Sequence, residues 1–269
     1  MREMVRKAGK YWTLFSLFGI ALAFLAFMPP GKTVPDNAAS GSIPNNSTIN
    51  GSTANIPTLN IPTPNIPTLA DSSRLNLIYN NLNLDSLGLS ADAFHKAIGG
   101  FLSMVLTGEI RNPGILSIID FTLPSNQKRL FVLDMLNGRL LFNTLVAHGR
   151  NSGKLIANRF SNRYNSYMSS LGFYLTGEPF IGQHGYSLHL DGKEKGWNDN
   201  VFRRSIIIHP AGYVSEEHIR QWGYLGRSEG CPAIPEELDR PIIDSIRGGS
   251  CLFIYAPDKK YLKRSKLLS

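Results

Sequence analysis

The chain has 269 residues, of which 42% are hydrophobic and 10% aromatic, enough for one well-buried domain with appendages or for two small domains. Its formal net charge of +8 comes from the two ends, because residues 1–10 carry +3, residues 259–269 carry +5, and residues 11–258 hold 19 basic and 19 acidic side chains. The neutral body lacks the basic excess that binding to nucleic acid requires.

Residues 1–30 have the pattern of a signal peptide or a signal anchor. A basic stretch ending at Lys10 precedes the apolar run Tyr11–Met28, which is about one bilayer thickness long. Ala26-Phe27-Met28 before Pro29 is a poor cleavage site, and no cysteine follows the run, so the pattern favours an uncleaved anchor over a lipoprotein. The basic flank predicts that everything after Pro29 lies outside the cytoplasm.

Residues 31–71 are predicted to be a linker. They are rich in Asn, Ser, Thr, Pro and Gly, and a five-residue Asn-Ile-Pro-Thr repeat begins at Asn55, Asn60 and Asn65. A proline in every repeat blocks helix and sheet and favours an extended tether.

The folded domain is expected to span residues 72–257 and to begin with two helices. Apolar spacing predicts the first over residues 72–84. Ser90 is the expected N-cap of the second, with Asp92 in its first turn and its end at Gly108.

After Pro113 the pattern becomes that of strands, and Asn137-Gly138 predicts a two-residue hairpin turn with positive φ at both positions. The predicted strands are Ile115–Phe121, Arg129–Met135, Leu140–Ala147, Gly172–Leu175, Tyr186–Leu190, Ser205–His209 and Cys251–Tyr255. Two more helices are expected, at Ser215–Gln221 and at Pro235–Ile246 before Gly248-Gly249.

These elements predict a β-rich α+β domain, a mixed sheet with N-terminal and peripheral helices, and no alternating βαβ units. Residues 258–269 are predicted to be a basic tail. Both a solvated tail and contact with anionic lipid or wall polymer fit its composition.

The two cysteines have different settings. An exported chain could join them in a disulfide, but Cys251 lies in an apolar strand and Cys231 lies in a loop before a helix, which argues against a bridge. Cys251 is expected to be a small buried hydrophobe.

Cys231 has the neighbours that a nucleophile needs. Gly230 would let a substrate carbonyl approach, and the amides of Gly230 and Cys231 would face the developing oxyanion. His209, at the end of an apolar strand, is the best candidate for the base that makes the thiolate, although a structural histidine also fits. A zinc triad of His184, His189 and His209 lacks any His-x-x-x-His frame, so we expect no metal or other cofactor.

The stretch Ser205–His209, followed after 18 residues by Ser228–Ala233, resembles the His…Ser-x-Gly-Cys signature of YkuD-type L,D-transpeptidases, with 21 residues between His209 and Cys231. The closer likeness is to the divergent branch of murein L,D-transpeptidase catalytic domain proteins, and it covers about residues 75–257. The further segments that carry it are Phe142–Gly153, Ser169–Gly177, Gly182–Leu188 and Glu194–Asn200. The resemblance implies an L,D-transpeptidase-like sheet or sandwich fold.

The resemblance also implies roles for individual residues. Cys231 would be the acyl-accepting nucleophile, His209 the general base, and the backbone carbonyl of Pro210 the group that orients the imidazole. Ser228 would support the loop or touch the substrate. His148 and His184, which each precede a glycine, would line the cleft or hold a loop.

Two positions depart from the family pattern: Glu229 replaces a histidine and Ala233 replaces an arginine. The cation for the substrate carboxylate is therefore assigned to Arg227 or, alternatively, to Arg203.

The predicted activity is cysteine acyl transfer on peptidoglycan stem peptides in the bacterial cell envelope, outside the cytoplasm and tethered to the inner membrane or secreted. Hydrolysis by the same Cys-His chemistry, as in an L,D-carboxypeptidase or amidase, is the first alternative. A non-catalytic wall-binding module is the second. The partners implied are stem peptides, and a membrane if residues 1–30 are retained, with no nucleic acid.

Overall fold

A computed structural model of the chain describes residues 72–268. The predicted signal segment (1–30) and linker (31–71) lie outside the described residues. No helix within 72–268 has the length and apolar character that crossing a bilayer requires.

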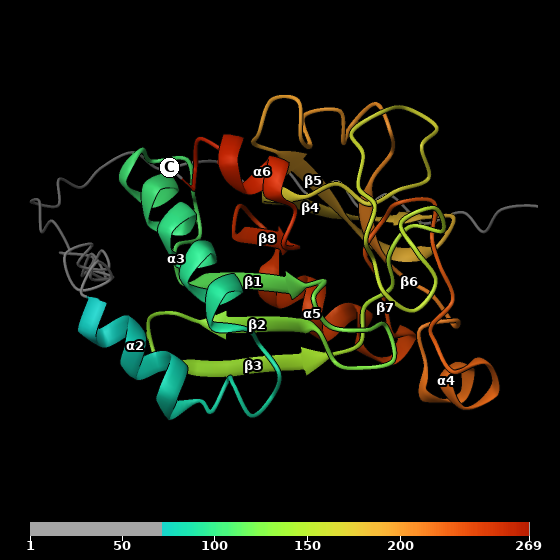
Figure 1. The fold of residues 1–269 in the computed structure, drawn as a ribbon, viewed down its shortest axis with the longest axis horizontal. Coiled ribbons are helices and arrows are strands. Elements are labelled where there is room, and N and C mark those ends of the chain that lie inside the picture. Colours follow the sequence, from blue (N-terminus) through green and yellow to red (C-terminus); the bar gives the residue numbers. More distant parts are fainter. Residues whose placement is uncertain (1–71, 269) are drawn as a thin grey trace, which may run out of the picture. The chain divides into compact units, whose positions relative to one another are not determined.

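Two helices open the domain, as predicted. Helix α2 covers Ser72–Asn81 and α3 covers Ala91–Leu106, with the Ser90 hydroxyl accepting a hydrogen bond from the Ala93 amide. The predicted first helix extended to residue 84, but Asn83 has φ +48°, and this left-handed conformation cannot continue a right-handed helix. One face of α3 is buried and packs against β1 and β8 (Figure 1).

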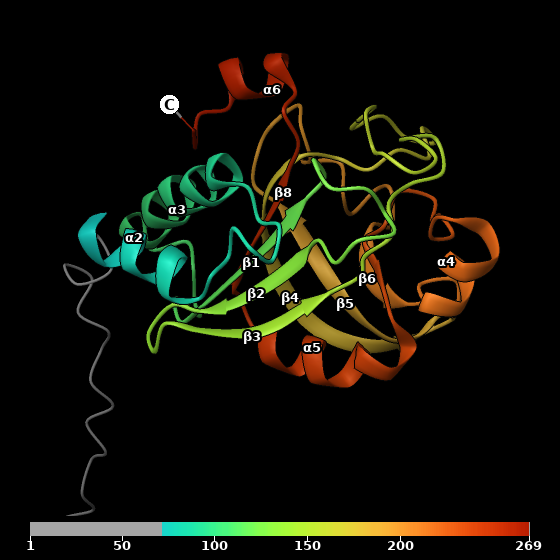
Figure 2. The same cartoon turned by 60° about the horizontal axis from the view of Figure 1, so that its bottom comes forward.

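The core of the domain is a mixed eight-stranded sheet in the order β3-β2-β1-β8-β4-β5-β6-β7. Neighbours are antiparallel except for the pairs β1–β8 and β6–β7, which are parallel. The strands are β1 (Ile115–Asp120), β2 (Leu130–Asp134), β3 (Arg139–Thr144), β4 (Gly172–Gly182), β5 (Gly185–Gly192), β6 (Ile207–Pro210), β7 (Ala233–Ile234) and β8 (Cys251–Tyr255). Figure 2 shows the sheet curving toward a near-barrel, with α5 along one end. The predicted β-rich mixed fold is confirmed.

The β2–β3 hairpin is present, but its turn is longer than the predicted two residues. Asp134 pairs with Arg139, so four residues connect the strands, and of the Asn137-Gly138 pair only Gly138 has positive φ, at +60°. The Asp134 carboxylate accepts hydrogen bonds from the Asn137 amide and side chain, at 3.0 and 2.8 Å, and these contacts stabilise the wider turn.

Strand β4 is much longer than the predicted Gly172–Leu175. Gly177 and Pro179 lie within it, and the pairing with β5 shifts register between Thr176 and Pro179. A bulge accommodates residues that a regular ladder excludes, so the strand continues to Gly182.

The remaining helices frame the sheet. Helix α4 covers Glu216–Trp222, close to the predicted Ser215–Gln221, and Ser215 caps it. The helix predicted over Pro235–Ile246 is divided into a 3-10 turn, Glu236–Leu238, and α5, Asp239–Ile246. Pro241 has no amide hydrogen and cannot donate to a carbonyl one turn earlier, so α5 restarts with Pro241 in its first turn.

The residues assigned to a basic tail contain a helix that packs on the domain. Helix α6 covers Lys259–Arg264, and Asp258 caps it. Tyr261 and Ser265 are buried and both donate hydrogen bonds to the Glu194 carboxylate, the first at 2.8 Å. The folded domain therefore continues past residue 257, because these two side chains complete its core.

The domain has two hydrophobic cores. The larger one lies between the sheet, α3 and α5. The smaller one lies beneath the loops around β6 and β7, and we call it the minor core. Its buried members are Leu145, Ala147, Ala211, Val214, Leu225 and Ala233.

Candidate active site

Strands β6 and β7 bring the two principal candidate residues together. His209 lies on β6 and pairs with Ala233 of β7, two residues after Cys231. Both side chains line one open pocket of about 590 Å³. The other residues around this catalytic pocket are Arg150, Gln183, His184, Arg204, Ser205, Ile206, Ile207, Tyr213, Arg227, Ser228 and Glu229.

His209 is held in an orientation suited to a base. Its ring is buried, and Nδ1 lies 2.9 Å from the Pro210 carbonyl oxygen, the contact that the family resemblance implied. A carbonyl only accepts, so Nδ1 carries the proton and Nε2 keeps its lone pair. Burial lowers the pKa of His209, and the nearby His184 lowers it further. The imidazole is therefore neutral at pH 7 and able to accept a proton.

Cys231 is a free, partly exposed cysteine in this pocket. Its thiol donates a long hydrogen bond to the Ser205 carbonyl, with Sγ and O 3.7 Å apart. Burial raises the pKa of the thiol, while the Ile207 backbone amide and the Arg204 charge act to lower it. The Glu229 charge also raises this pKa, and the net shift is upward, so the resting group is the thiol, and the amide and the cation act to stabilise the thiolate once the proton is removed.

Cys251 differs from Cys231 in every relevant property. It is fully buried on β8, and burial raises the pKa of its thiol well above the ordinary value. Both cysteines are free, so no disulfide joins them, and Cys251 fills core volume as predicted.

The loop before Cys231 is built differently from the prediction. The Gly230 amide donates to the Ser228 hydroxyl at 3.1 Å, so it does not face the pocket as an oxyanion donor. The same hydroxyl donates to the Cys231 carbonyl at 2.6 Å. Ser228 therefore supports the loop, and the Cys231 amide is left as the donor from this loop that lies beside the sulfur.

Gly230 is required for a reason that concerns packing. Its φ is +128°, a conformation that side chains rarely adopt, and a Cβ there would lie 2.7 Å from the Met168 carbonyl oxygen. The glycine thus lets the segment of residues 161–170 approach the catalytic loop, a packing requirement that the sequence did not indicate, and the approach of a substrate carbonyl to Gly230 stays a prediction.

The cations of the pocket are more numerous than the sequence indicated. Arg227 lines the pocket and is exposed, with a hydrogen bond of 3.3 Å to the Gly153 carbonyl. Arg203, the alternative for binding a carboxylate, is not among the residues around the pocket, whereas its neighbour Arg204 is. Arg150 also lines it and lies 3.4 Å from Glu229.

The two remaining histidines have separate roles. His184 is exposed at the pocket, and its ring stacks on that of His209. His148 is fully buried, with Nδ1 2.7 Å from an Arg129 guanidinium nitrogen and Nε2 3.3 Å from the Gly153 carbonyl. Of the two functions weighed for His148, the structural one fits, because the residue is fully buried and both ring nitrogens already have partners.

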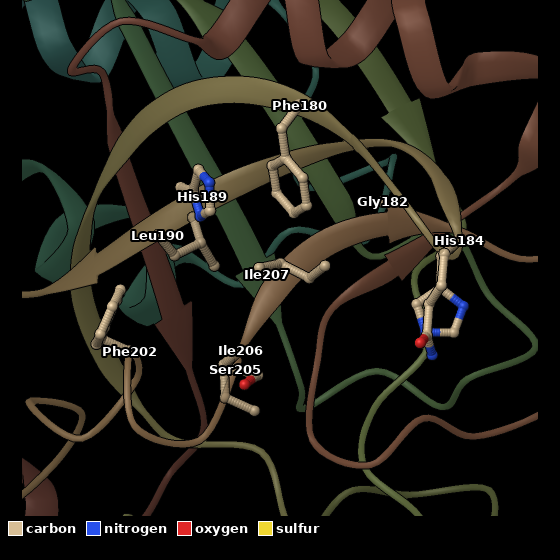
Figure 3. A pocket seen from close by; sticks show the side chains of 10 residues that line it. Phe180, Gly182, His184, His189, Leu190, Phe202, Ser205, Ile206 and Ile207 are labelled. Atoms are coloured by element: carbon tan, nitrogen blue, oxygen red, sulfur yellow. The ribbon is translucent and has the colours of Figure 1, made fainter.

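A second pocket, of about 530 Å³, adjoins the catalytic pocket and shares with it Gln183, His184 and the segment Ser205–Ile207. Figure 3 shows the aromatic residues Phe180 and Phe202 at separate sides of this space. No aspartate, glutamate, lysine or arginine lines this second pocket. Of the two adjoining pockets, only the catalytic pocket is lined by such charged side chains.

Within residues 72–268, no three His, Cys, Asp or Glu side chains are grouped closely enough to hold a metal ion.

Comparison with known proteins identifies the family. Residues 85–255, more than half of the chain, match the L,D-transpeptidase catalytic domain family. The chain belongs to this family. The matched range of this L,D-transpeptidase domain contains both pocket-lining candidates, His209 and Cys231, and ends with β8 at Tyr255. A comparison with curated protein sequences finds no match.

Solved structures similar to this L,D-transpeptidase domain share little sequence with it. An L,D-transpeptidase from Mycobacterium smegmatis is 12% identical, with a TM-score of 0.33, over 53% of this chain and 59% of that chain. An L,D-transpeptidase from Stackebrandtia nassauensis is 11% identical over 62% and 68%, with a TM-score of 0.33. The helical cell shape determining protein from Campylobacter jejuni is 12% identical over 54% and 48%, with a TM-score of 0.35. The chain thus spans about 60% of the mycobacterial structure.

Proposed function

We propose that this protein is a cysteine acyltransferase acting on peptidoglycan stem peptides, an L,D-transpeptidase. One observation carries the proposal: the partly exposed Cys231 thiol and the neutral His209 imidazole line the same open pocket, with Nδ1 of His209 bound to Pro210 and Nε2 left as a base. Membership of the L,D-transpeptidase catalytic domain family supports the choice of substrate.

The first half of the reaction forms a thioester. His209 Nε2 takes the thiol proton, and the Cys231 sulfur attacks the amide carbonyl between an L-centre and the terminal D-amino acid. A C–S bond forms, and the amide C–N bond breaks. The leaving amine takes a proton from the His209 imidazolium, and the terminal D-residue departs. The Cys231 amide, beside the sulfur, is placed to donate to the oxyanion.

The second half returns the enzyme to its starting state. An acceptor amine gives a proton to His209 and attacks the thioester carbonyl, so a new C–N bond forms as the C–S bond breaks. The thiol regains its proton from the imidazolium. The exposed guanidinium of Arg227 supplies a cation for a substrate carboxylate at the pocket mouth.

The test is to incubate the full chain with disaccharide-tetrapeptide and to analyse protein and products by mass spectrometry. We expect an acyl adduct on Cys231, release of the terminal D-residue, and a product joined to an amine. Cys231→Ala should abolish all three. Cys251→Ala is the matched control, and it should retain them if the protein folds.

The products also decide between transfer and hydrolysis. A product that gains the elements of water, with an acyl adduct still on Cys231, would make the protein a carboxypeptidase or amidase. No adduct and no product from the intact protein would contradict both activities and leave a wall-binding module.

We also propose that the domain works outside the cytoplasm, because Tyr11–Met28 follows a basic flank. A fusion of the full chain to a reporter that folds only in an oxidising compartment should be active. Replacing four leucines and phenylalanines of that run by arginine should abolish the signal. An inactive fusion to the intact chain would overturn this localisation.

A further inference from the structure

We propose that Arg204 is a positioning residue that clamps the segment 161–170, here called the strap, against the catalytic loop and places a fixed positive charge beside Cys231. The effect on catalysis rests on the proposed function. The clamp and the charge themselves act on the Cys231 thiol whether or not acyl transfer follows.

Arg204 binds the strap through four acceptors. One terminal guanidinium nitrogen donates to the Ser161 carbonyl, at 2.8 Å, and to the Ser170 hydroxyl. The other donates to the Met168 carbonyl and, at 3.3 Å, to the Ser166 hydroxyl. These bonds join both ends and the middle of the strap to one planar group, which a lysine cannot do because its ammonium lacks the fork geometry.

The strap in turn contacts the loop that carries the nucleophile. Ser169 donates from its hydroxyl to the Gly230 carbonyl at 3.3 Å and accepts from the Gly149 amide at 3.1 Å. A Cβ on Gly230 would lie 3.0 Å from an Arg204 nitrogen and 2.7 Å from the Met168 oxygen. Arg204, the strap and the catalytic loop are therefore in direct van der Waals contact.

The backbone at Arg204 adds a second link to the thiol. Ser205 has φ +53°, a left-handed conformation that is costly for a residue with a Cβ. Its carbonyl is the acceptor for the Cys231 thiol. Fixing the Arg204 side chain holds the turn in which Ser205 adopts this conformation, so the clamp also positions the group that orients the sulfur.

The charge of Arg204 acts directly on Cys231. It lowers the pKa of the thiol, and Cys231 raises the pKa of the arginine in return. Four of the five guanidinium donors are already used on the strap, so Arg204 is not free to bind a substrate carboxylate in a bidentate manner, unlike Arg227. Around the pocket, the other charged or titratable side chains near Cys231 are Arg150, His184, His209, Tyr213, Arg227 and Glu229.

The experiment measures the rate at which iodoacetamide alkylates Cys231 in the full chain as a function of pH, with the modified peptide identified by mass spectrometry. Arg204→Met should move the midpoint of this profile up by about one pH unit, because the thiolate loses the positive charge that acts to lower its pKa. Arg203→Met is the matched control, since Arg203 lies next in sequence but not in the pocket, and its midpoint should equal that of the wild type.

Arg204→Lys separates the charge from the clamp. The midpoint of its alkylation profile should stay close to that of the wild type. Chymotrypsin should nevertheless cleave this variant faster than the wild type, at Tyr164 and Tyr167 within the strap. An unchanged midpoint in folded Arg204→Met, or an equal shift in Arg203→Met, would overturn the role of the charge.

If Arg204→Met does not fold, Arg204→Lys decides: a lysine variant as resistant to chymotrypsin as the wild type would overturn the clamp. Alkylation needs no substrate, so these outcomes are independent of whether acyl transfer is observed.

Discussion

The imidazole of His184 stacks on that of His209, with ring centroids 4.4 Å apart and 27° between the planes. His184 is exposed and His209 is buried, so the outer ring shields the inner one from water. Burial is the main reason that the pKa of His209 lies below its ordinary value, and the nearby His184 adds to it.

Removing this shield should therefore move the acid limb of the activity profile. In His184→Ala, water reaches His209, its pKa rises, and the neutral base is lost at a higher pH, by about half a unit or more. His184→Phe keeps the stacked ring and should move the limb less. The dependence of kcat/KM on pH checks this, and identical acid limbs for the alanine variant and the wild type would contradict it.

His148 should make the fold sensitive to acid. Burial and the adjoining Arg129 lower the pKa of His148 to about 3, whereas the unfolded value is about 6.5. The unfolded chain therefore binds the extra proton first, and stability falls as pH drops from 6.5 toward 3. Between pH 6.5 and 4.5 the loss should be roughly 2–3 kcal/mol, from about 1.4 kcal/mol per unit.

Urea denaturation across that range measures the loss. His148→Gln offers the same two hydrogen-bonding functions without a titration, so its free energy of unfolding should depend less on pH. The partly exposed His218→Gln is the control and should follow the wild type. An equally steep pH dependence in His148→Gln would show that another group controls acid unfolding.

Gly230→Ala should destabilise the domain by roughly 3 kcal/mol, because it adds left-handed backbone strain to the overlap with the Met168 carbonyl. Gly223→Ala is the matched control. Gly223 also has positive φ, +78°, but a Cβ there meets nothing within 4 Å, so only strain of about 1 kcal/mol is expected. Equal losses for the two variants in urea denaturation would contradict the close approach of the strap.

Tyr261→Phe should loosen α6, because the Glu194 carboxylate loses a hydrogen-bond donor in a buried setting, at a cost of about 1–2 kcal/mol. Burial raises the pKa of Glu194, so its contribution is fully present below the unfolded pKa and falls as pH rises through the folded one. The charged carboxylate present at pH 8 depends more on the Tyr261 donor than the protonated form present at pH 4, so the loss from Tyr261→Phe should be larger at pH 8 than at pH 4. The exposed Lys260→Ala should be neutral at both, and a pH-independent effect of Tyr261→Phe would refute this.

Local chemistry made part of this domain predictable. Ser90 and Ser215 cap helices because their hydroxyls satisfy amides one turn ahead, and β8 has the predicted bounds because Cys251–Tyr255 is uniformly apolar. His209, Pro210 and Cys231 were found by motif, and the structure places them around one pocket or in contact.

The features that the sequence did not indicate depend on contacts between distant segments. The clamp joins Arg204 to acceptors 34 to 43 residues away, and no periodicity marks such pairs. Helix α6 is basic along its length, yet Tyr261 is buried, and its hydroxyl donates a hydrogen bond to the distant Glu194 carboxylate. Gly230 was singled out for the approach of a substrate, whereas the close contact with the Met168 carbonyl depends on a segment about 60 residues earlier that the local pattern does not indicate.

The pairing of β6 with β7 has a consequence for how the enzyme loses activity. Only two residue pairs, His209 with Ala233 and Pro210 with Ile234, join these strands, and the minor core beneath them is separate from the main one. Ile208 and Ile234 still hold these strands to the main core, but we expect local opening of this edge to need less energy than global denaturation and to part the base from the nucleophile. On warming, activity is therefore expected to disappear before the sheet melts, and amide exchange should be fastest at this edge.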